Sequence, residues 1–140
     1  MKLELATPTR MLVSAEVDEV VAPGIEGYFG VLPGHAALLT TLGSGVVSYR
    51  TGQTEKHLLV AGGFAEVQPD RVIILAEVAE APEEIDRERA ERARQRAEAR
   101  LAGRHPPGSE GEGEIDFDRA LAALGRALAR IMVAGRVRSA

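Results

Sequence analysis

The fold is decided at residues 81–90, which read Ala81-Pro82-Glu83-Glu84-Ile85-Asp86-Arg87-Glu88-Arg89-Ala90. Before this stretch, short apolar runs alternate with polar residues and are punctuated by glycines and prolines. After it, alanine, arginine and glutamate dominate, with apolar residues three or four positions apart. Alternation is typical of strands and the longer spacing is typical of helices. The sequence therefore predicts an antiparallel β-sandwich over residues 1–81, followed by an antiparallel α-helical hairpin over residues 82–140.

The composition excludes several classes of protein. The chain has no cysteine, so it forms no disulfide or thiolate metal site, and its net charge of −4 argues against a nucleic-acid binder. No apolar run approaches the roughly 18 residues that a membrane-spanning helix needs. We therefore expect no nucleic-acid partner, and membrane association only through other proteins.

The strands are expected where short runs rich in β-branched residues lie between turn signals such as Pro23-Gly24, Thr51-Gly52, Gly62-Gly63 and Pro69-Asp70. No stretch between these runs could form a crossover helix, which favours a sandwich or flattened barrel. The expected strands are Leu3–Thr7, Met11–Val13, Val17–Ala22, Ala37–Leu42, Val46–Tyr49, His57–Val60, Phe64–Val67 and Val72–Glu77.

The glycine-rich stretch at residues 24–35 has the spacing of a phosphate-binding loop but lacks its context. Such a loop must open into a helix whose N-terminal amides meet the phosphate, whereas here Pro33-Gly34 follows. We interpret the glycines as turn and close-contact residues. The apolar pair Tyr28-Phe29 and the nearby His35 would then form a rigid docking surface for a partner.

The two helices are expected over residues 82–102 and from Ile115 or Asp116 onward, with a loop at residues 103–111. Apolar residues of the first helix are mainly alanine, and those of the second lie on one face. We expect that face to pack in the hairpin, and we expect the alanine-lined contact to be only marginally stable. The apolar positions are Ala90, Ala93, Ala97 and Leu101 in the first helix, and Phe117, Leu121, Leu124, Leu128 and Ile131 in the second.

Some of the helical arginines have no carboxylate three or four residues away on their own helix, namely Arg96, Arg126 and Arg130. In an antiparallel hairpin, Asp86 and Arg89 approach Arg126 and Arg130, and Asp86 is the only carboxylate that we expect near them. A cluster of guanidinium groups with one carboxylate suits a polyphosphate with a base or ribose. An acidic surface on a partner protein would suit the same arginines.

Nothing in the sequence indicates a catalytic or metal site. His35, His57 and His105 are far apart and have no neighbours at metal-ligand spacing. Ser44 and Ser48 lack the G-x-S-x-G turn of a serine nucleophile. We therefore expect no catalytic residue, no metal and no required cofactor.

The chain resembles the epsilon-subunit family of the F-type rotary ATP synthases. The resemblance rests on motifs that occur in order along nearly the whole chain. These are Gly30-Val31-Leu32-Pro33-Gly34-His35-Ala36-Ala37-Leu38-Leu39, Gly62-Gly63-Phe64, Ile85-Asp86-x-x-Arg89-Ala90 and Asp116-Phe117-x-Arg119-Ala120.

The resemblance implies a non-catalytic rotor subunit of a proton-translocating ATP synthase, on the cytoplasmic side of the bacterial inner membrane. It implies a ten-stranded sandwich bound to the gamma subunit and the membrane c-ring, and a hairpin that is compact or extends into the alpha/beta catalytic head to impede ATP hydrolysis. Many relatives carry an acidic residue where this chain has Tyr28-Phe29, which implies apolar docking to the c-ring.

The resemblance also implies ATP as a regulatory ligand of the compact hairpin. The ATP-binding residues carried over from the family are Glu80, Ile85, Asp86, Arg89, Arg96, Arg126 and Arg130. Two alternatives remain open: a free-standing ATP-binding sensor and a small hydrolase with an unrecognised carboxylate site.

Overall fold

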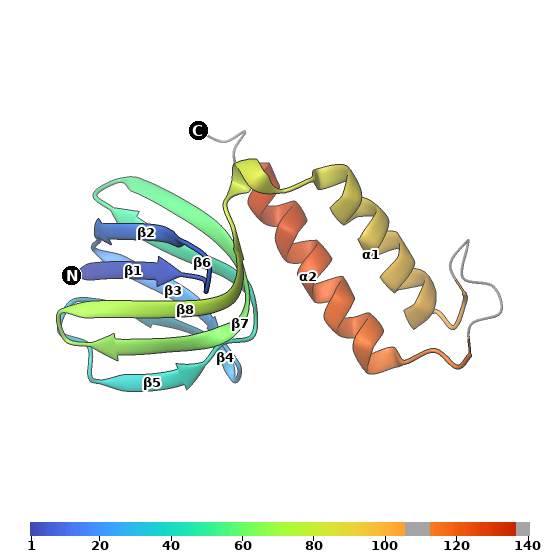
Figure 1. The fold of residues 1–140 in the computed structure, drawn as a ribbon, viewed down its shortest axis with the longest axis horizontal. Helices are drawn as coiled ribbons and strands as arrows, with labels where there is room; N and C mark the ends of the chain where they lie inside the picture. The colour runs from blue at the N-terminus through green and yellow to red at the C-terminus, as the bar shows by residue number, and fades with distance from the viewer. Residues whose placement is uncertain (106–112, 137–140) are drawn as a thin grey trace.

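The computed structural model describes residues 1–105 and 113–136 of the chain. A β-sandwich is followed by two helices that project from one end of it, with α2 nearer the sandwich and α1 on its outer side (Figure 1). The first helix ends at Leu101, before the loop expected at residues 103–111, and residues 106–112 lie outside the described part. The elements are β1 (Lys2–Ala6), β2 (Met11–Glu16), β3 (Glu19–Gly24), β4 (Gly27–Val31), β5 (Leu38–Thr41), β6 (Ser44–Thr51), β7 (Thr54–Gln68), β8 (Arg71–Glu80), the 3-10 turn η1 (Pro82–Glu84), α1 (Arg87–Leu101) and α2 (Phe117–Arg136).

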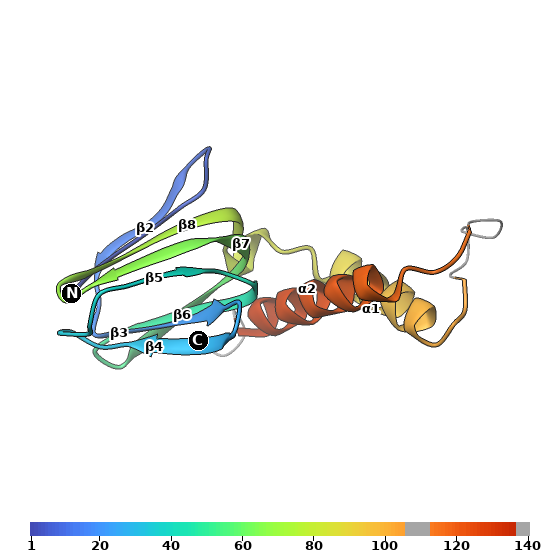
Figure 2. The ribbon, with the colours of Figure 1, turned by 90° about the horizontal axis from the view of Figure 1, so that it is seen from below.

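The strands are hydrogen-bonded in the order β2-β1-β8-β7-β6-β3-β4, with β5 on a second segment of β7. Folding of this sheet on itself gives two layers, seen edge-on in Figure 2. Alternate residues point between the layers and form the core, as Leu3 and Leu5 of β1 do at 0% exposure. One pairing, β1 with β8, is parallel, and the other pairs among the described strands are antiparallel. Eight strands are described, fewer than the ten that the resemblance implied.

The sheet turns from one layer to the other within β7. Gly62 and Gly63, predicted as a turn between two strands, instead lie inside this single strand with φ of 72 and 113. The first half of β7 pairs with β6 and the second half with β5. A Cβ at Gly63 would collide with the carbonyl oxygen of Leu75 and lie 2.8 Å from Cα of Ala76. Glycine is therefore required here both for its backbone angle and for its lack of a side chain.

The glycine-rich stretch forms a β-hairpin, as its turn chemistry suggested, but it contributes a strand that the sequence reading did not include. β3 and β4 pair from Val20–Val31 to Gly24–Gly27, and Gly27 has φ of 131. Tyr28 is 60% exposed, yet its hydroxyl accepts a hydrogen bond from the amide of Val46 at 3.0 Å. The β3–β4 hairpin is thereby fastened to β6.

Both helices begin later than the sequence suggested because an aspartate caps each of them. Oδ1 of Asp86 accepts the amide of Arg89 at 3.0 Å, so α1 begins at Arg87, while Pro82 starts the short η1 turn instead. Asp116 accepts the amide of Arg119 in the same way before α2. α2 continues through Gly135 to Arg136.

Candidate functional site

A pocket of about 380 Å³ lies between the two helices at the end near the sandwich. Its walls come from the end of β8, from η1 and from both helices. Most of the predicted nucleotide-binding residues meet here. The lining residues are Glu80, Glu84, Asp86, Arg89, Ala90, Ala93, Arg96 and Arg130.

Arg130 of α2 is paired with Glu80, the last residue of β8. Its Nε and one terminal nitrogen each donate to a carboxylate oxygen of Glu80 at 3.2 Å, and both side chains are under 30% exposed. This bidentate geometry is the stronger form of an arginine-carboxylate contact. The expectation that Asp86 would be the only carboxylate near Arg130 was therefore wrong. The partner lies 50 residues away in sequence, beyond the reach of spacing rules.

The remaining carboxylates of the pocket also have partners. Glu84 accepts a hydrogen bond from Arg10 at 2.6 Å and another from the amide of Ala81 at 3.1 Å. These bonds, the one from Arg10 above all, hold the pKa of Glu84 below its usual value. Asp86 is engaged as the cap of α1.

Arg89 and Arg96 differ from the other charged groups of the pocket. Across the described ranges, neither side chain makes a hydrogen bond or ion pair. They stand seven residues apart on α1 and line the same pocket. A ligand with negative charge would therefore meet two guanidinium groups that form no ion pair with the carboxylates of the described residues.

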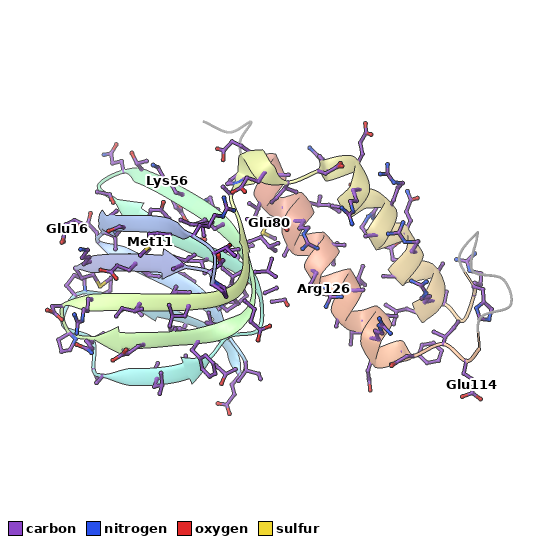
Figure 3. The ribbon with its side chains drawn as sticks, viewed as in Figure 1. Met11, Glu16, Lys56, Glu80, Glu114 and Arg126 are labelled. Atoms are coloured by element: carbon purple, nitrogen blue, oxygen red, sulfur yellow. The ribbon has the colours of Figure 1, made fainter. Side chains whose placement is uncertain are left out.

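Two of the residues predicted for this site lie elsewhere. Ile85 packs against an apolar cluster in which Val46 and Leu59 of the sandwich meet Ala129 and Val133 of α2. Arg126 lies on α2 away from the end of the helix that is near Glu80 (Figure 3). It lines a separate pocket of about 420 Å³ toward the far end of the hairpin. That second pocket also contains Arg100, Asp116 and Arg119.

The buried seam of the hairpin is lined by alanine on both helices, which corrects the expectation for α2. Of the five apolar residues expected to pack, Leu124 and Ile131 are partly buried, but Phe117, Leu121 and Leu128 are 52%, 60% and 47% exposed. Small residues let the helix backbones approach closely, so the larger residues remain outside. We call the exposed face the α2 stripe, comprising Phe117, Leu121, Leu128 and Met132. The buried alanines at or below 4% exposure are Ala90, Ala97, Ala120 and Ala127.

A second apolar surface, which the sequence reading missed, lies on the outer face of the sheet. Phe64 of β7 is directly opposite Leu75 of β8, and each is 57% exposed. Leu75 lies beside Ala6, which in turn pairs with the exposed Met11. We call this surface the sheet patch. The signal was present as apolar residues at outward positions, but it can be recognised only once strand register is known.

The predicted docking residues in the glycine-rich region are not equally accessible. Tyr28 is exposed, whereas Phe29 is partly buried against the sandwich core. His35 is partly buried, and its Nδ1 lies 2.6 Å from the carbonyl oxygen of Ala36.

Ser48 and His57, treated separately in the sequence reading, are cross-strand neighbours with Oγ 2.8 Å from Nδ1. Among the residues that the structure places, no group of side chains could hold a metal ion. None of the helices there is long and apolar enough to cross a membrane.

The family of ATP synthase delta/epsilon chains matches along the chain: its beta-sandwich domain over residues 1–82 and its long alpha-helix domain over residues 83–135. The chain belongs to this family. It is 51% identical over 138 residues to the ATP synthase epsilon chain of Moorella thermoacetica, covering 98% of each. It is also 51% identical to that of Syntrophobacter fumaroxidans over 134 residues, 96% of this chain and 95% of the relative.

Solved structures of more distant proteins share the fold. A chain in the Euglena gracilis mitochondrial ATP synthase, in a structure of OSCP, F1 and the c-ring, aligns with a TM-score of 0.72 at 24% identity, over 99% of this chain and 80% of that one. A chain in the Tetrahymena thermophila central stalk and c-ring aligns with a TM-score of 0.53 at 15% identity, over 97% and 94%. The family's sandwich and helical domains thus agree with the observed architecture.

Proposed function

We propose that the chain is a non-catalytic rotor subunit of a proton-translocating F-type ATP synthase. In this role the sandwich, residues 1–81, links a gamma subunit to the c-ring. The hairpin, residues 82–140, regulates ATP hydrolysis by exchanging its place on the sandwich for contacts in the alpha/beta catalytic head. The complex would lie on the cytoplasmic side of a bacterial inner membrane. Relatives named ATP synthase epsilon chain that align over nearly the full chain support this assignment.

The observation that carries the regulatory role is the α2 stripe. The interface between the helices buries mainly alanine, and the large apolar side chains of the stripe stay exposed, Leu121 at 60%. Full burial of a leucine side chain contributes about 1.5–3 kcal/mol, several times what a methyl group contributes. When α2 leaves the sandwich, it loses the apolar contacts of the cluster around Val133. Burial of the stripe against a second protein would compensate for that loss.

Two surfaces of the sandwich serve as the rotor contacts in this proposal. The sheet patch, with Phe64 and Leu75 at its centre, is an ordered apolar area that suits a gamma subunit. The region of Tyr28, Phe29 and His35 would contact the c-ring, with Tyr28 as its exposed member. Ordered apolar surface loses little conformational entropy when it binds, which favours both assignments.

Reconstitution of the ATP synthase with truncated and substituted subunits tests the regulatory role. A chain ending at Ala81 should fold and bind the stalk but no longer inhibit hydrolysis, because the larger of the two apolar clusters lies entirely within the sandwich. Leu121→Asp in the full chain should relieve inhibition without loss of binding, whereas Ala122→Asp, at an exposed position beside the stripe, should not. A truncated chain that inhibits as well as the full chain would refute the proposal.

We propose ATP as a regulatory ligand of the pocket beside Glu80. Arg96→Ala should weaken ATP binding by about 1.5–3 kcal/mol, or roughly ten- to a hundredfold, the contribution of one charge-assisted contact. Arg92→Ala is the matched control, because Arg92 is exposed on α1 and lines neither interhelical pocket. Calorimetry on the isolated subunit measures both, and equal affinities would place the nucleotide elsewhere.

Arg126 provides a second test of the same site. Its position outside the pocket predicts a smaller effect of Arg126→Ala than of Arg96→Ala, unless nucleotide binding draws the side chain inward. A loss equal to that of Arg96→Ala would therefore indicate a rearranged hairpin in the bound state.

The alternative of a free-standing ATP-binding sensor rests on Arg89 and Arg96, whose side chains have no partner in the described part of the chain. It would be favoured by micromolar ATP binding in a chain that captures no gamma subunit from a native membrane extract.

A further inference from the structure

The connection between the sandwich and the hairpin is short and largely extended. Ala81 and Ile85 have extended backbone angles on either side of η1, with ψ of 156 and 123. Asp86, at ψ of 99, completes the passage into α1. Any rotation of the hairpin relative to the sandwich must pass through these residues, because β8 ends at Glu80 and α1 begins at Arg87.

Glu84 links this connection to a part of the sandwich that is distant in sequence but adjacent in space. Arg10 lies in the turn between β1 and β2, 74 residues earlier in the chain, and donates to one carboxylate oxygen of Glu84 at 2.6 Å. The same guanidinium nitrogen lies 3.4 Å from the carbonyl oxygen of Ala79 on β8. The other oxygen of Glu84 accepts the amide of Ala81.

The contact thus joins the β1–β2 turn, the end of β8 and η1 through one guanidinium and one carboxylate. Glu84 also lines the interhelical pocket, and η1 lies against α2. The hydrogen bond from Arg10 is also the main cause of the lowered pKa of Glu84, so the contact favours the charged carboxylate.

We infer that Arg10 and Glu84 form a latch that holds the hairpin in the compact arrangement. Release of the latch frees η1 to reorient, and the hairpin then leaves the sandwich more readily. The inference rests on the proposed function, since it requires a hairpin with a docked and an undocked state. It assigns control of that equilibrium to a sandwich residue that lines neither interhelical pocket.

The position of Arg10 gives the latch a route to a partner. Met11, the next residue, is 55% exposed and belongs to the sheet patch. A subunit that docks on the patch contacts the β1–β2 turn and can shift the Arg10 guanidinium relative to Glu84. Rotor binding and hairpin release are then coupled through one turn.

A distance measurement on the full chain tests the latch. The chain has no cysteine, so cysteines introduced at the exposed Gln53 of the sandwich and Gln95 of α1 give a single labelled pair. Spin-label distance distributions would report the docked and undocked populations. Arg10→Ala and Glu84→Ala should each raise the undocked-to-docked ratio about two- to fivefold, as expected for one exposed ion pair.

The double variant and a control make the result specific. Arg10→Ala with Glu84→Ala should raise the ratio by less than the two single changes combined, because both single changes remove the same Arg10–Glu84 contact. Lys2→Ala, which removes another ion pair of the sandwich away from the hinge, should leave the ratio unchanged. Additive effects in the double variant would overturn the latch but not the two-state hairpin. The same conclusion would follow if docked and undocked populations were both resolved and Arg10→Ala left their ratio unchanged. A single docked population in every variant, with and without ATP, would overturn both the latch and the proposed two-state hairpin.

Discussion

Substitution of Gly63 by alanine should strongly destabilise the sandwich. An L-residue in the left-handed region costs about 1–2 kcal/mol, and Gly63 has φ of 113. The added Cβ also meets the backbone of Leu75 and Ala76, which cannot rotate away as a side chain could. Overpacking of this kind costs about 1–3 kcal/mol. The sum predicts a loss of about 2–5 kcal/mol in the free energy of unfolding.

Gly52→Ala separates the two contributions. Gly52 also has positive φ, of 61, but a Cβ there would meet nothing within 4 Å. This control should therefore lose only the backbone contribution. Urea unfolding of the full chain, followed by circular dichroism, gives both free energies with their m-values. Equal losses in the two variants would refute the reasoning, because they would mean that β7 absorbs the side chain without strain.

Three other changes test the hairpin and the rotor contact. Ala97→Leu should force the helices apart and lower the thermal stability of the helical signal, whereas Ala122→Leu, on an exposed position of α2, should not. Acid should weaken the compact state: the pKa of Glu84 is lowered, so its stabilisation is present above the ordinary carboxyl value of 4.5 and is lost as pH falls below it. Glu84→Gln should remove this part of the pH dependence in the distance measurement. Tyr28→Asp should reduce the yield of rotor complex in co-purification, and an unchanged yield would place the c-ring contact elsewhere.

The sequence predicted the division into sandwich and hairpin because the two halves differ in the spacing of their apolar residues. That spacing can be recognised without any knowledge of long-range contacts. It could not distinguish a turn from a bend at Gly62-Gly63, since glycine permits both. The start of α1 was misplaced because Pro82 suits a first helical turn, although the Asp86 side chain supplies the cap. Each of these errors concerns a residue type with more than one common role.

The candidate site was predictable as a set of residues but not as a network. Arg89 and Arg96 could be placed on one helix by spacing, whereas the pairing of Arg130 with Glu80 depends on how α2 meets β8. The buried face of α2 was misjudged for a related reason. Hydrophobicity predicted that the leucines of α2 would be buried, but the alanines of both helices form the interface instead. The sequence of α2 alone does not show which residues of α1 it will meet.

The parallel pairing of β1 with β8 has a consequence for how the chain folds during synthesis. Lys2 aligns with Arg71, so one edge of β1 stays unpaired until β8, the last strand described, has been synthesised. Such distant pairing raises contact order and slows folding. The register of β6 with the first half of β7 can be established earlier, and with it the Val46–Leu59 contact on which α2 later docks. The nascent chain can therefore form the surface on which α2 packs before β1 can pair with β8.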